Sequence, residues 1–455
     1  MRYVSTRGAA PELGFADVVL EGLANDGGLY VPASWPALPS SLPTRYAELA
    51  AEVILPYAGE DFDHATILRL CEESYATFRH PDVVPLVEIE PNHYLMELFH
   101  GPTLAFKDVA LQLLGRLFDT ILTARSERVM IVGATSGDTG SAAIDGVKNC
   151  ANVDIVILYP QGRVSDVQRR QMTTVESPNV HTVAVEGTFD DCQDLVKAMF
   201  NDAAFRDAHN LSAVNSINWA RVMAQIVYYV AATERLGSRI DVTVPTGNFG
   251  NVLSGWIAQR MGAPVDKLIV ASNENDILTR FFESHSMNVT GVHPTLSPSM
   301  DIQVSSNFER LLFEMNGRDG AMTREQLVRF RDKGMLAVEP DQYDAWIAPT
   351  FRAGRASDHD TLATIRSVYE STGMQIDPHT AVGVKAAREN VRDGVTMVTM
   401  ATAHPAKFPD AVERATGVRP VLPAHMADLM DRPERTTVLP NDLAAIQKFV
   451  ASVAR

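Results

Sequence analysis

Short apolar segments rich in β-branched residues alternate with amphipathic segments through most of the chain after residue 91. The apolar segments are residues 129–134, 153–159, 180–185, 242–245, 268–271 and 395–400. Between them, Trp219, Val222, Met223, Ile226, Val227 and Val230 recur with the spacing of one helix face. Uniformly apolar strands separated by helices predict an α/β fold, in which helices cover both faces of parallel sheets.

Two regions depart from this alternation and suggest the domain organisation. Residues 1–90 are mainly helical in pattern, with one glycine-rich turn at 25–28, and we expect them to form a separate N-terminal domain. Residues 91–455 would form the catalytic region. Within it we expect a smaller lobe at about 126–234 and a larger lobe from about 91–125 and 235–455. The polar, irregular stretch near 280–375 would be an insertion in the larger lobe.

Composition narrows the class of protein. The 455 residues are 46% hydrophobic and 21% charged, as is typical of a soluble globular protein, and the formal net charge is −16. Such a surface repels phosphate backbones and anionic lipid, so neither nucleic acid nor a membrane is an expected partner. No apolar run reaches the roughly 18 residues of a membrane helix. The three cysteines are widely spaced and form no metal-ligand cluster, which favours reduced thiols in a cytoplasmic protein without a metal.

The segment 100–108 contains a lysine in an unusual setting. Lys107 follows Phe106 at the junction between a loop and an apolar helix expected over 109–118. Burial there would lower the pKa of the amine and make it nucleophilic. An ordinary exposed lysine in the first turn of a helix is the alternative.

Two glycine-rich turns each follow a predicted strand and open a predicted helix. Residues 133–141 are small enough to let the backbone approach an anion such as a carboxylate. Residues 246–251 resemble a cradle for a single phosphate. Neither turn has the spacing of a dinucleotide-binding or Walker loop. For both, a merely tight turn between strand and helix is the alternative.

A fourth segment, 401–408, follows the last predicted strand. The hydroxyl of Thr402 could bind a ring nitrogen without supplying negative charge, although it could also simply cap the strand. A lysine, a phosphate cradle, an anion-binding turn and a neutral hydroxyl are together what a pyridoxal 5′-phosphate (PLP) enzyme needs.

Three segments of the chain resemble the threonine synthase family of PLP enzymes, which make L-threonine from O-phospho-L-homoserine. They are residues 100–108, 133–140 and 215–221, and the likeness extends to 3–7, 27–32, 247–251 and 401–408. The resemblance implies the tryptophan-synthase-like fold (fold type II) in its longer branch, with an extra N-terminal domain. It also implies a carbon–oxygen lyase that eliminates phosphate from Cγ, adds water at Cβ, and completes threonine biosynthesis.

The resemblance also implies roles for particular residues. Lys107 would be the catalytic lysine that forms the Schiff base, and Thr402 would face the pyridine nitrogen. Asp138 stands where many relatives of this fold carry Asn against the cofactor's 3′-oxygen. The cofactor's phosphate would be held by Gly247, Asn248, Phe249, Gly250 and Asn251.

The substrate's two anionic groups need donors of their own. Our candidates for its carboxylate are Thr135, Ser136 and Thr139, and those for its phosphate are Ser216, Asn218 and Arg221. Arg221 offers a bidentate fork, and Lys407 is a weaker candidate for the phosphate.

Other functions remain open at this point. The nearest is another eliminating PLP enzyme, such as a threonine dehydratase or a phospholyase that releases 2-oxobutyrate. A non-catalytic protein that binds PLP or a phosphometabolite is a second possibility, and a dinucleotide oxidoreductase is a distant third. We expect a monomer or a homodimer acting on a small molecule.

Overall fold

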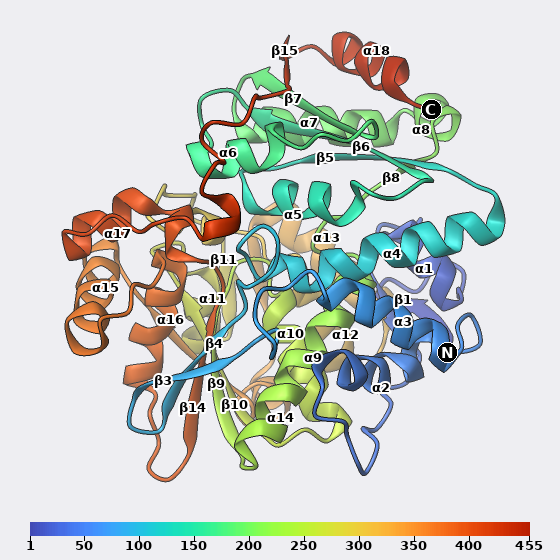
Figure 1. The fold of residues 1–455 in the computed structure, drawn as a ribbon. Helices are drawn as coiled ribbons and strands as arrows, with labels where there is room; N and C mark the ends of the chain where they lie inside the picture. Colours follow the sequence, from blue (N-terminus) through green and yellow to red (C-terminus); the bar gives the residue numbers. More distant parts are fainter.

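Two sheets with parallel cores organise the computed structural model, which describes all 455 residues (Figure 1). The larger sheet has the order β13-β10-β9-β14-β4-β3, and only the β3–β4 pair is antiparallel. Its strands are β3 (Leu86–Glu90), β4 (His93–Glu97), β9 (Ile240–Pro245), β10 (Val265–Ser272), β13 (Phe351–Arg355) and β14 (Thr396–Ala401). All six predicted strands are present in the two sheets, so the predicted α/β fold class is confirmed.

The smaller sheet is wholly parallel, with the order β15-β7-β6-β5-β8. Its strands are β5 (Val129–Ala134), β6 (Val153–Pro160), β7 (Val180–Glu186), β8 (Leu211–Ser212) and β15 (Thr437–Pro440). Every residue of β6 is buried, as expected of a central strand covered on both faces. In Figure 1 this sheet lies at the top and the larger sheet at the lower left.

Helices surround both sheets. They are α4 (Lys107–Arg125), α5 (Asp138–Val147), α6 (Asp166–Thr173), α7 (Phe189–Asn201), α8 (Ala203–Ala208), α9 (Trp219–Leu236), α10 (Gly250–Met261), α11 (Ile277–Ser284), α12 (Phe308–Met315), α13 (Gly320–Lys333), α14 (Pro340–Trp346), α15 (Asp358–Thr372), α16 (Pro378–Glu389), α17 (Pro409–Thr416) and α18 (Leu443–Val453). No helix has the length and apolar character needed to cross a membrane.

Helix α9 is more deeply buried than its sequence pattern predicts. The expected apolar face is buried, but so is every other position from 219 to 233, polar Arg221 and Gln225 included. The cause is its place in the fold, because α2 (Tyr46–Ala58), α4 and α10 all pack against it. A polar side chain at the start of α9 is therefore enclosed by protein and needs a specific partner.

The N-terminal residues are joined to the rest of the molecule by a shared core. Strands β1 (Tyr3–Ser5) and β2 (Tyr30–Pro32) pair antiparallel, and α1 (Phe15–Glu21), α2 and α3 (His64–Tyr75) supply the helical content that was predicted. Tyr57 of α2 packs edge-on against Trp219 at the start of α9, with ring centroids 5.5 Å apart. The N-terminal helices lie at the lower right of Figure 1, beside α4 and α9.

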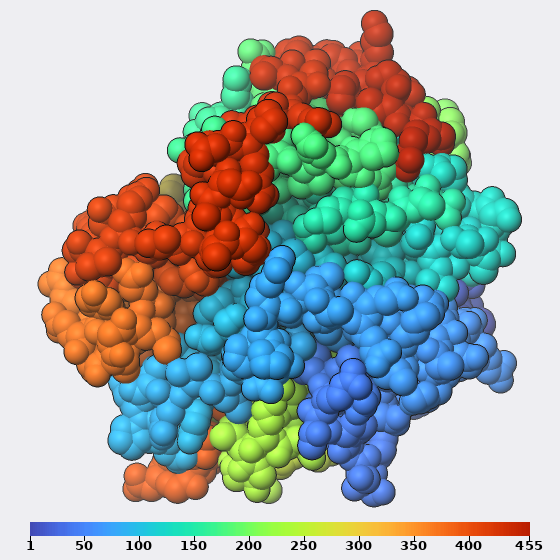
Figure 2. Space-filling model, viewed as in Figure 1, coloured from blue at the N-terminus to red at the C-terminus, as the bar shows by residue number.

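The C-terminal end departs from the expected division of the chain, which assigned all of 235–455 to the larger lobe. Residues 418–436 cross from the larger sheet to the smaller one, where β15 extends the edge and α18 packs (Figures 1 and 2). Ile446 and Val450 of α18 are fully buried against the apolar face of that sheet. Strand β15 is short and mostly exposed, so no apolar run marks it in the sequence.

The stretch 280–375 is more regular than its polar composition predicts. It contains most of α11, all of α12 to α15, and the small antiparallel pair β11 (Ser286–Asn288) and β12 (Met335–Ala337). Strand β13 from this stretch pairs with β10 and forms one edge of the larger sheet. Its position at an edge explains the mixed exposure of its side chains and the weak strand pattern.

Candidate active site

The loop that carries Lys107 is fixed against the end of β14. The N–H of Phe106 donates to the carbonyl of Thr402 (2.9 Å), and the N–H of His404 donates to Leu104 (3.0 Å). Ala105 and Ala403 form an isolated bridge between these two bonds. This pairing brings two residues predicted for the site, Lys107 and Thr402, side by side although they are 295 positions apart.

Lys107 is the first residue of α4 and is only 9% exposed. Its Nζ lies 3.4 Å from Oδ2 of Asp138. Burial lowers the pKa of Lys107. The nearby cations Lys407 and Arg221 lower this pKa further, whereas the Asp138 carboxylate raises it. The alternative of an ordinary exposed lysine therefore does not hold, and the side chain has the environment of a reactive amine.

Asp138 lies between two lysines. Besides its contact with Lys107, it accepts a hydrogen bond from Gln168 (2.7 Å) and pairs with Lys407 at 3.0 Å. Burial alone would raise the pKa of Asp138, but the two ammonium groups and the Gln168 amide hold it well below its usual range. Asp138 is therefore an ionised carboxylate. Lys407 is fully buried, and its Nζ also donates hydrogen bonds to the carbonyl of Thr103 and to Oε1 of Gln171.

The first glycine-rich turn, between β5 and α5, is closed by its own side chain. Oγ1 of Thr135 accepts hydrogen bonds from the N–H groups of Gly137 (3.0 Å) and Gly140 (2.9 Å). Gly137 has φ +149°, and a Cβ there would lie 2.5 Å from Cδ of Gln168. The N–H groups of Ser136, Asp138 and Thr139 have no acceptor within the protein. The turn thus presents free donors at a helix N-terminus.

The second turn, between β9 and α10, has a larger set of free donors. None of the N–H groups of residues 247–252 donates a hydrogen bond within the protein. Phe249 adopts the left-handed conformation with φ +62°, which is uncommon for a bulky residue. Nδ2 of Asn251 is buried without a partner, while its Oδ1 accepts from Tyr228 and Tyr229. This arrangement fits the phosphate of PLP.

Among the three residues expected to bind the substrate phosphate, Arg221 alone combines a charged side chain with an unused buried donor. It is 3% exposed, its Nη1 donates to the carbonyl of Val214, and its Nε has no partner. Desolvation lowers its pKa to about 10. Asn218 instead caps α9 and donates to the carbonyl of Val19, so its side chain is engaged in structure. The Ser216 side chain forms no hydrogen bond within the protein.

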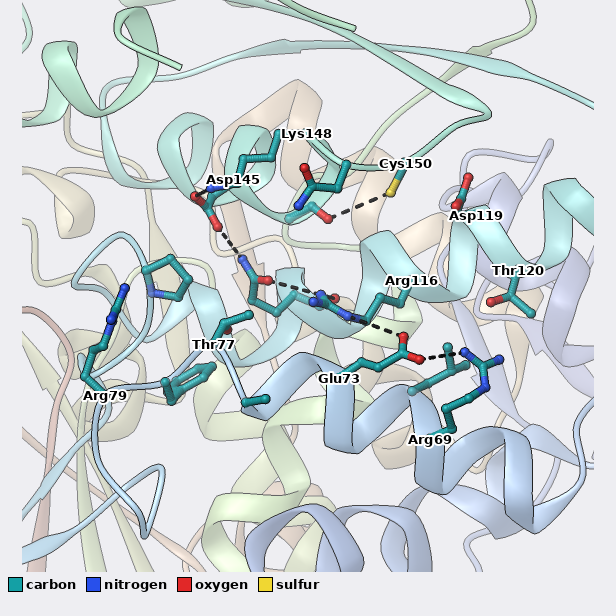
Figure 3. A pocket seen from close by; sticks show the side chains of 17 residues that line it. Arg69, Glu73, Thr77, Arg79, Arg116, Asp119, Thr120, Asp145, Lys148 and Cys150 are labelled. Carbon is teal, nitrogen blue, oxygen red and sulfur yellow. Dashed lines mark hydrogen bonds and ion pairs between the residues drawn. The ribbon is translucent and has the colours of Figure 1, made fainter. Parts of the chain in front are cut away.

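A cavity of about 590 Å³ lies elsewhere, between α3, α4 and the end of α5 (Figure 3). None of the predicted site residues lines it. Most of its charged side chains form ion pairs: Lys148 pairs with Asp145, and Arg69 and Arg116 both pair with Glu73. The neutral Gln112 amide also donates to Asp145 (2.8 Å). Arg79 is the one cation of the lining without a carboxylate partner, so the cavity has fewer free donors than the two turns.

Several residues that shape the site were missed by the sequence analysis. Gln168 and Gln171 sit on α6, and Ser305 and Asn307 lie before α12, on the polar stretch regarded as an insertion. Ser305 donates to the carbonyl of Gly247 (2.7 Å), and Asn307 donates to that of Asn248. No motif marks these residues, because each contacts a group far away in the sequence. For Gln168 that group is the Asp138 carboxylate, and for the other three it is a backbone carbonyl.

These features define the class. The neighbouring parallel strands β9 and β14 end just before Thr246 and Thr402, a buried lysine faces a carboxylate, and a free N–H cradle opens α10. They are the parts of a PLP-dependent enzyme of fold type II. Residues 80–329 match the protein family described as "Pyridoxal-phosphate dependent enzyme". The cofactor of this chain is accordingly pyridoxal 5′-phosphate.

The flanking regions identify the family. Residues 2–75 match the family described as "Threonine synthase N terminus", and residues 380–450 match the family described as "Threonine synthase, C-terminal". The threonine synthase of Pseudomonas aeruginosa is 54% identical over 99% of this chain and 98% of its own length. The chain belongs to the threonine synthase family.

Solved structures agree with this conclusion. The PLP-bound threonine synthase from Brucella melitensis superimposes with a TM-score of 0.97 at 52% identity and covers all of both chains. The threonine synthase from yeast gives a TM-score of 0.93 at 38% identity, covering 99% of this chain and 98% of the other. The similarity thus includes the N-terminal residues and both sheets.

Proposed function

We propose that the residues gathered at the carboxyl ends of the two sheets carry out the threonine synthase reaction in this chain. The reaction converts O-phospho-L-homoserine and water into L-threonine and phosphate, the last step of threonine biosynthesis. The observation that carries the assignment is the buried Lys107 amine, which contacts Asp138 at 3.4 Å and whose pKa is lowered by burial and by the cations Lys407 and Arg221.

The cofactor would be held by groups that the protein leaves free. The N–H groups of residues 247–252 and the Asn251 amide would bind its phosphate. The Asp138 carboxylate would contact its 3′-oxygen. Thr402 would offer the ring nitrogen a neutral hydroxyl, so that no carboxylate holds a proton there. When bound, PLP supplies an electron sink for the negative charge that develops at the substrate Cα.

The protein's own residues would then move protons and hold the substrate. Lys107 Nζ would take the proton from Cα, and its lowered pKa suits it to this role. A Cβ proton and the Cγ phosphate would then leave, and a proton would return at Cγ. Water would add its hydroxyl at Cβ and give its remaining proton to the released phosphate, while Lys107 returns a proton to Cα. The departing phosphate can itself serve as acid or base. The N–H groups of Ser136 and Thr139 would hold the substrate carboxylate, with Thr135 shaping their turn.

Arg221 is the proposed ligand of the substrate phosphate, and its replacement tests the substrate site separately from the cofactor site. For Arg221→Ala we expect KM for O-phospho-L-homoserine to rise at least tenfold, since a charged hydrogen bond contributes about 1.5–3 kcal/mol. The visible absorbance of bound PLP should stay normal. Arg235→Ala, at the other end of the same helix, is the matched control, because Arg235 only holds the carbonyls of Asp82 and Val84.

An unchanged KM in Arg221→Ala would exclude this role. The same assays separate the family reaction from simple elimination, because phosphate release should be matched by L-threonine. Equimolar 2-oxobutyrate in place of threonine would support a phospholyase instead.

We further propose a cytoplasmic enzyme that is a monomer or homodimer. The cytoplasmic location is supported by the cysteines: Cys71, Cys150 and Cys192 are all buried and unpaired, as suits a reducing compartment.

We also propose that residues 1–90 form an N-terminal domain and that about 126–234 form the core of the smaller lobe, to which β15 and α18 are added.

A further inference from the structure

Asn307 occupies the N-cap position of α12 but does not cap the helix. Asparagine is a favoured N-cap because its side-chain oxygen accepts a hydrogen bond from the first turn. Here no such bond exists. The Asn307 side chain is fully buried and is directed instead toward Arg310 and two loop carbonyls. The helix thus forgoes a stabilising cap, and the side chain serves other contacts.

The orientation of the Asn307 amide is fixed by chemistry. Nη1 of Arg310 donates to Oδ1 of Asn307, and a guanidinium can only donate, so the oxygen must face Arg310. The Asn307 NH2 group consequently faces the carbonyls of Asn248 (3.0 Å) and Ser216 (3.1 Å). The backbone N–H of Asn307 adds a second bond to Asn248 (3.1 Å). One side chain therefore joins the phosphate cradle to the segment that precedes Arg221.

Arg310 extends this connection to the N-terminal domain. Its Nε donates to the carbonyl of Tyr30 in β2 (3.0 Å), and its Nη2 donates to that of Ile217 (2.7 Å). Arg310 is 1% exposed, and no carboxylate contacts it, because the neighbouring Glu309 is engaged by Arg7 and Thr6. A buried cation with only neutral partners is costly, so its placement points to a role beyond stability.

We infer that Arg310 and Asn307 are positioning residues, through which the N-terminal domain sets the geometry of the cofactor-phosphate cradle and of the adjoining substrate segment. The three backbones involved are those of Tyr30, residues 216–217 and Asn248. Tying the Asn248 carbonyl on one side leaves the N–H groups of the turn free on the other. The inference rests on the proposed assignment of residues 247–252 as the cradle.

The variant Asn307→Asp tests this with little change of shape. The carboxylate keeps its contact with Arg310, but its second oxygen then faces the carbonyls of Asn248 and Ser216 and repels them. We expect the dissociation constant of PLP, followed by tryptophan fluorescence, to rise at least tenfold. KM for O-phospho-L-homoserine should rise as well, while thermal unfolding of the PLP-free protein changes little. Arg310→Gln should shift both constants in the same direction.

Arg318→Gln is the matched control. Arg318 also donates to N-terminal carbonyls, those of Pro32 and Ala33, but it contacts neither loop. It should lower the unfolding temperature of the PLP-free protein and leave the PLP dissociation constant within twofold. If Asn307→Asp does not yield folded protein, Asn307→Ser is measured with the same expectations.

Folded Asn307→Asp with unchanged PLP affinity and KM would overturn the inference, and so would an Arg318→Gln variant that reproduces the loss. Either result leaves the proposed function intact as long as the unmodified protein binds PLP and makes threonine. Failure of the unmodified protein in those two assays would instead refute the proposed function.

Discussion

The two glycine-rich turns present free N–H groups at helix N-termini but are held in shape by different means. The turn at 133–141 is closed from within, by the hydroxyl of Thr135. The turn at 246–251 is held from outside, by Ser305 and Asn307. A turn closed locally can be predicted from its own residues. A turn supported from elsewhere exposes more donors, but its support is invisible in the local sequence.

Adding a methyl group to the externally held turn should have the largest effect. In Gly247→Ala the new Cβ would lie 2.6 Å from the carbonyl oxygen of Ser299, a backbone atom that cannot easily move. Overpacking of about 1–3 kcal/mol corresponds to a PLP dissociation constant raised about 5- to 150-fold. Gly133→Ala is the control, because its Cβ would meet only the flexible end of Ile157 at 3.3 Å. Equal PLP affinity in both variants would contradict the comparison.

Removing the internal closure should affect the substrate rather than the cofactor. Thr135→Val keeps the shape of the side chain but leaves the N–H groups of Gly137 and Gly140 without their acceptor, at about 1–3 kcal/mol for each buried donor. We expect KM for O-phospho-L-homoserine to rise about tenfold, with PLP affinity nearly unchanged. Steady-state kinetics and PLP titration separate the two effects. A loss of PLP affinity without a change in KM would reverse the roles we assign to the turns.

Removing one external bond should have a smaller effect on the cofactor. Ser305→Ala deletes the hydroxyl that donates to Gly247, a bond with a net contribution of about 0.5–1.5 kcal/mol. The PLP dissociation constant should rise about two- to tenfold, and KM should stay the same. Fluorescence titration measures the first quantity. A wild-type dissociation constant would show that the Asn307 contacts hold the turn without Ser305.

The loop before Lys107 is a third case and is closed from within by Asp108. This carboxyl accepts from the N–H and the hydroxyl of Thr103, and burial raises its pKa to about 7. A raised pKa in the folded state means that its contribution to stability is complete below about pH 4 and is lost as pH rises through about 7. Relative to Asp108→Asn, the unmodified protein should therefore lose a few degrees of unfolding temperature between pH 5 and 8. A constant difference between the two proteins would contradict this account.

The contrast between features set by local residues and features set by distant residues also explains how much of the fold and the site could be predicted from the sequence. Strands β5, β9 and β14 are apolar inner strands, so their pattern identified them, and Asp138 and Thr402 follow from segments next to them. Lys107 was predicted from its place at the junction between a loop and a helix, because β4 before it was not predicted. Strands β13 and β15 lie at sheet edges, are short, and carry exposed residues, so periodicity did not reveal them. The C-terminal helix α18 was assigned to the wrong lobe for the same reason.

The supporting residues escaped prediction because their partners are backbone atoms distant in sequence. Asn307 lies 59 positions from Asn248, and Arg310 lies 280 positions from Tyr30. Every residue has a backbone carbonyl, so the residue type does not show which carbonyl accepts a particular hydrogen bond. Asn218 is a different case: its type suggested a phosphate ligand, and in the structure its side chain already bonds the carbonyl of Val19 and the N–H of Ala220.

The central claim is that the Lys107 amine bonds covalently to the cofactor, and borohydride reduction tests it most directly. Reduction of the PLP-loaded protein fixes the pyridoxyl group on the lysine that holds it, and peptide mass mapping then locates the label. We predict a single pyridoxyl group on Lys107. A label on Lys407, the other buried lysine beside Asp138, or no label at all would contradict the account.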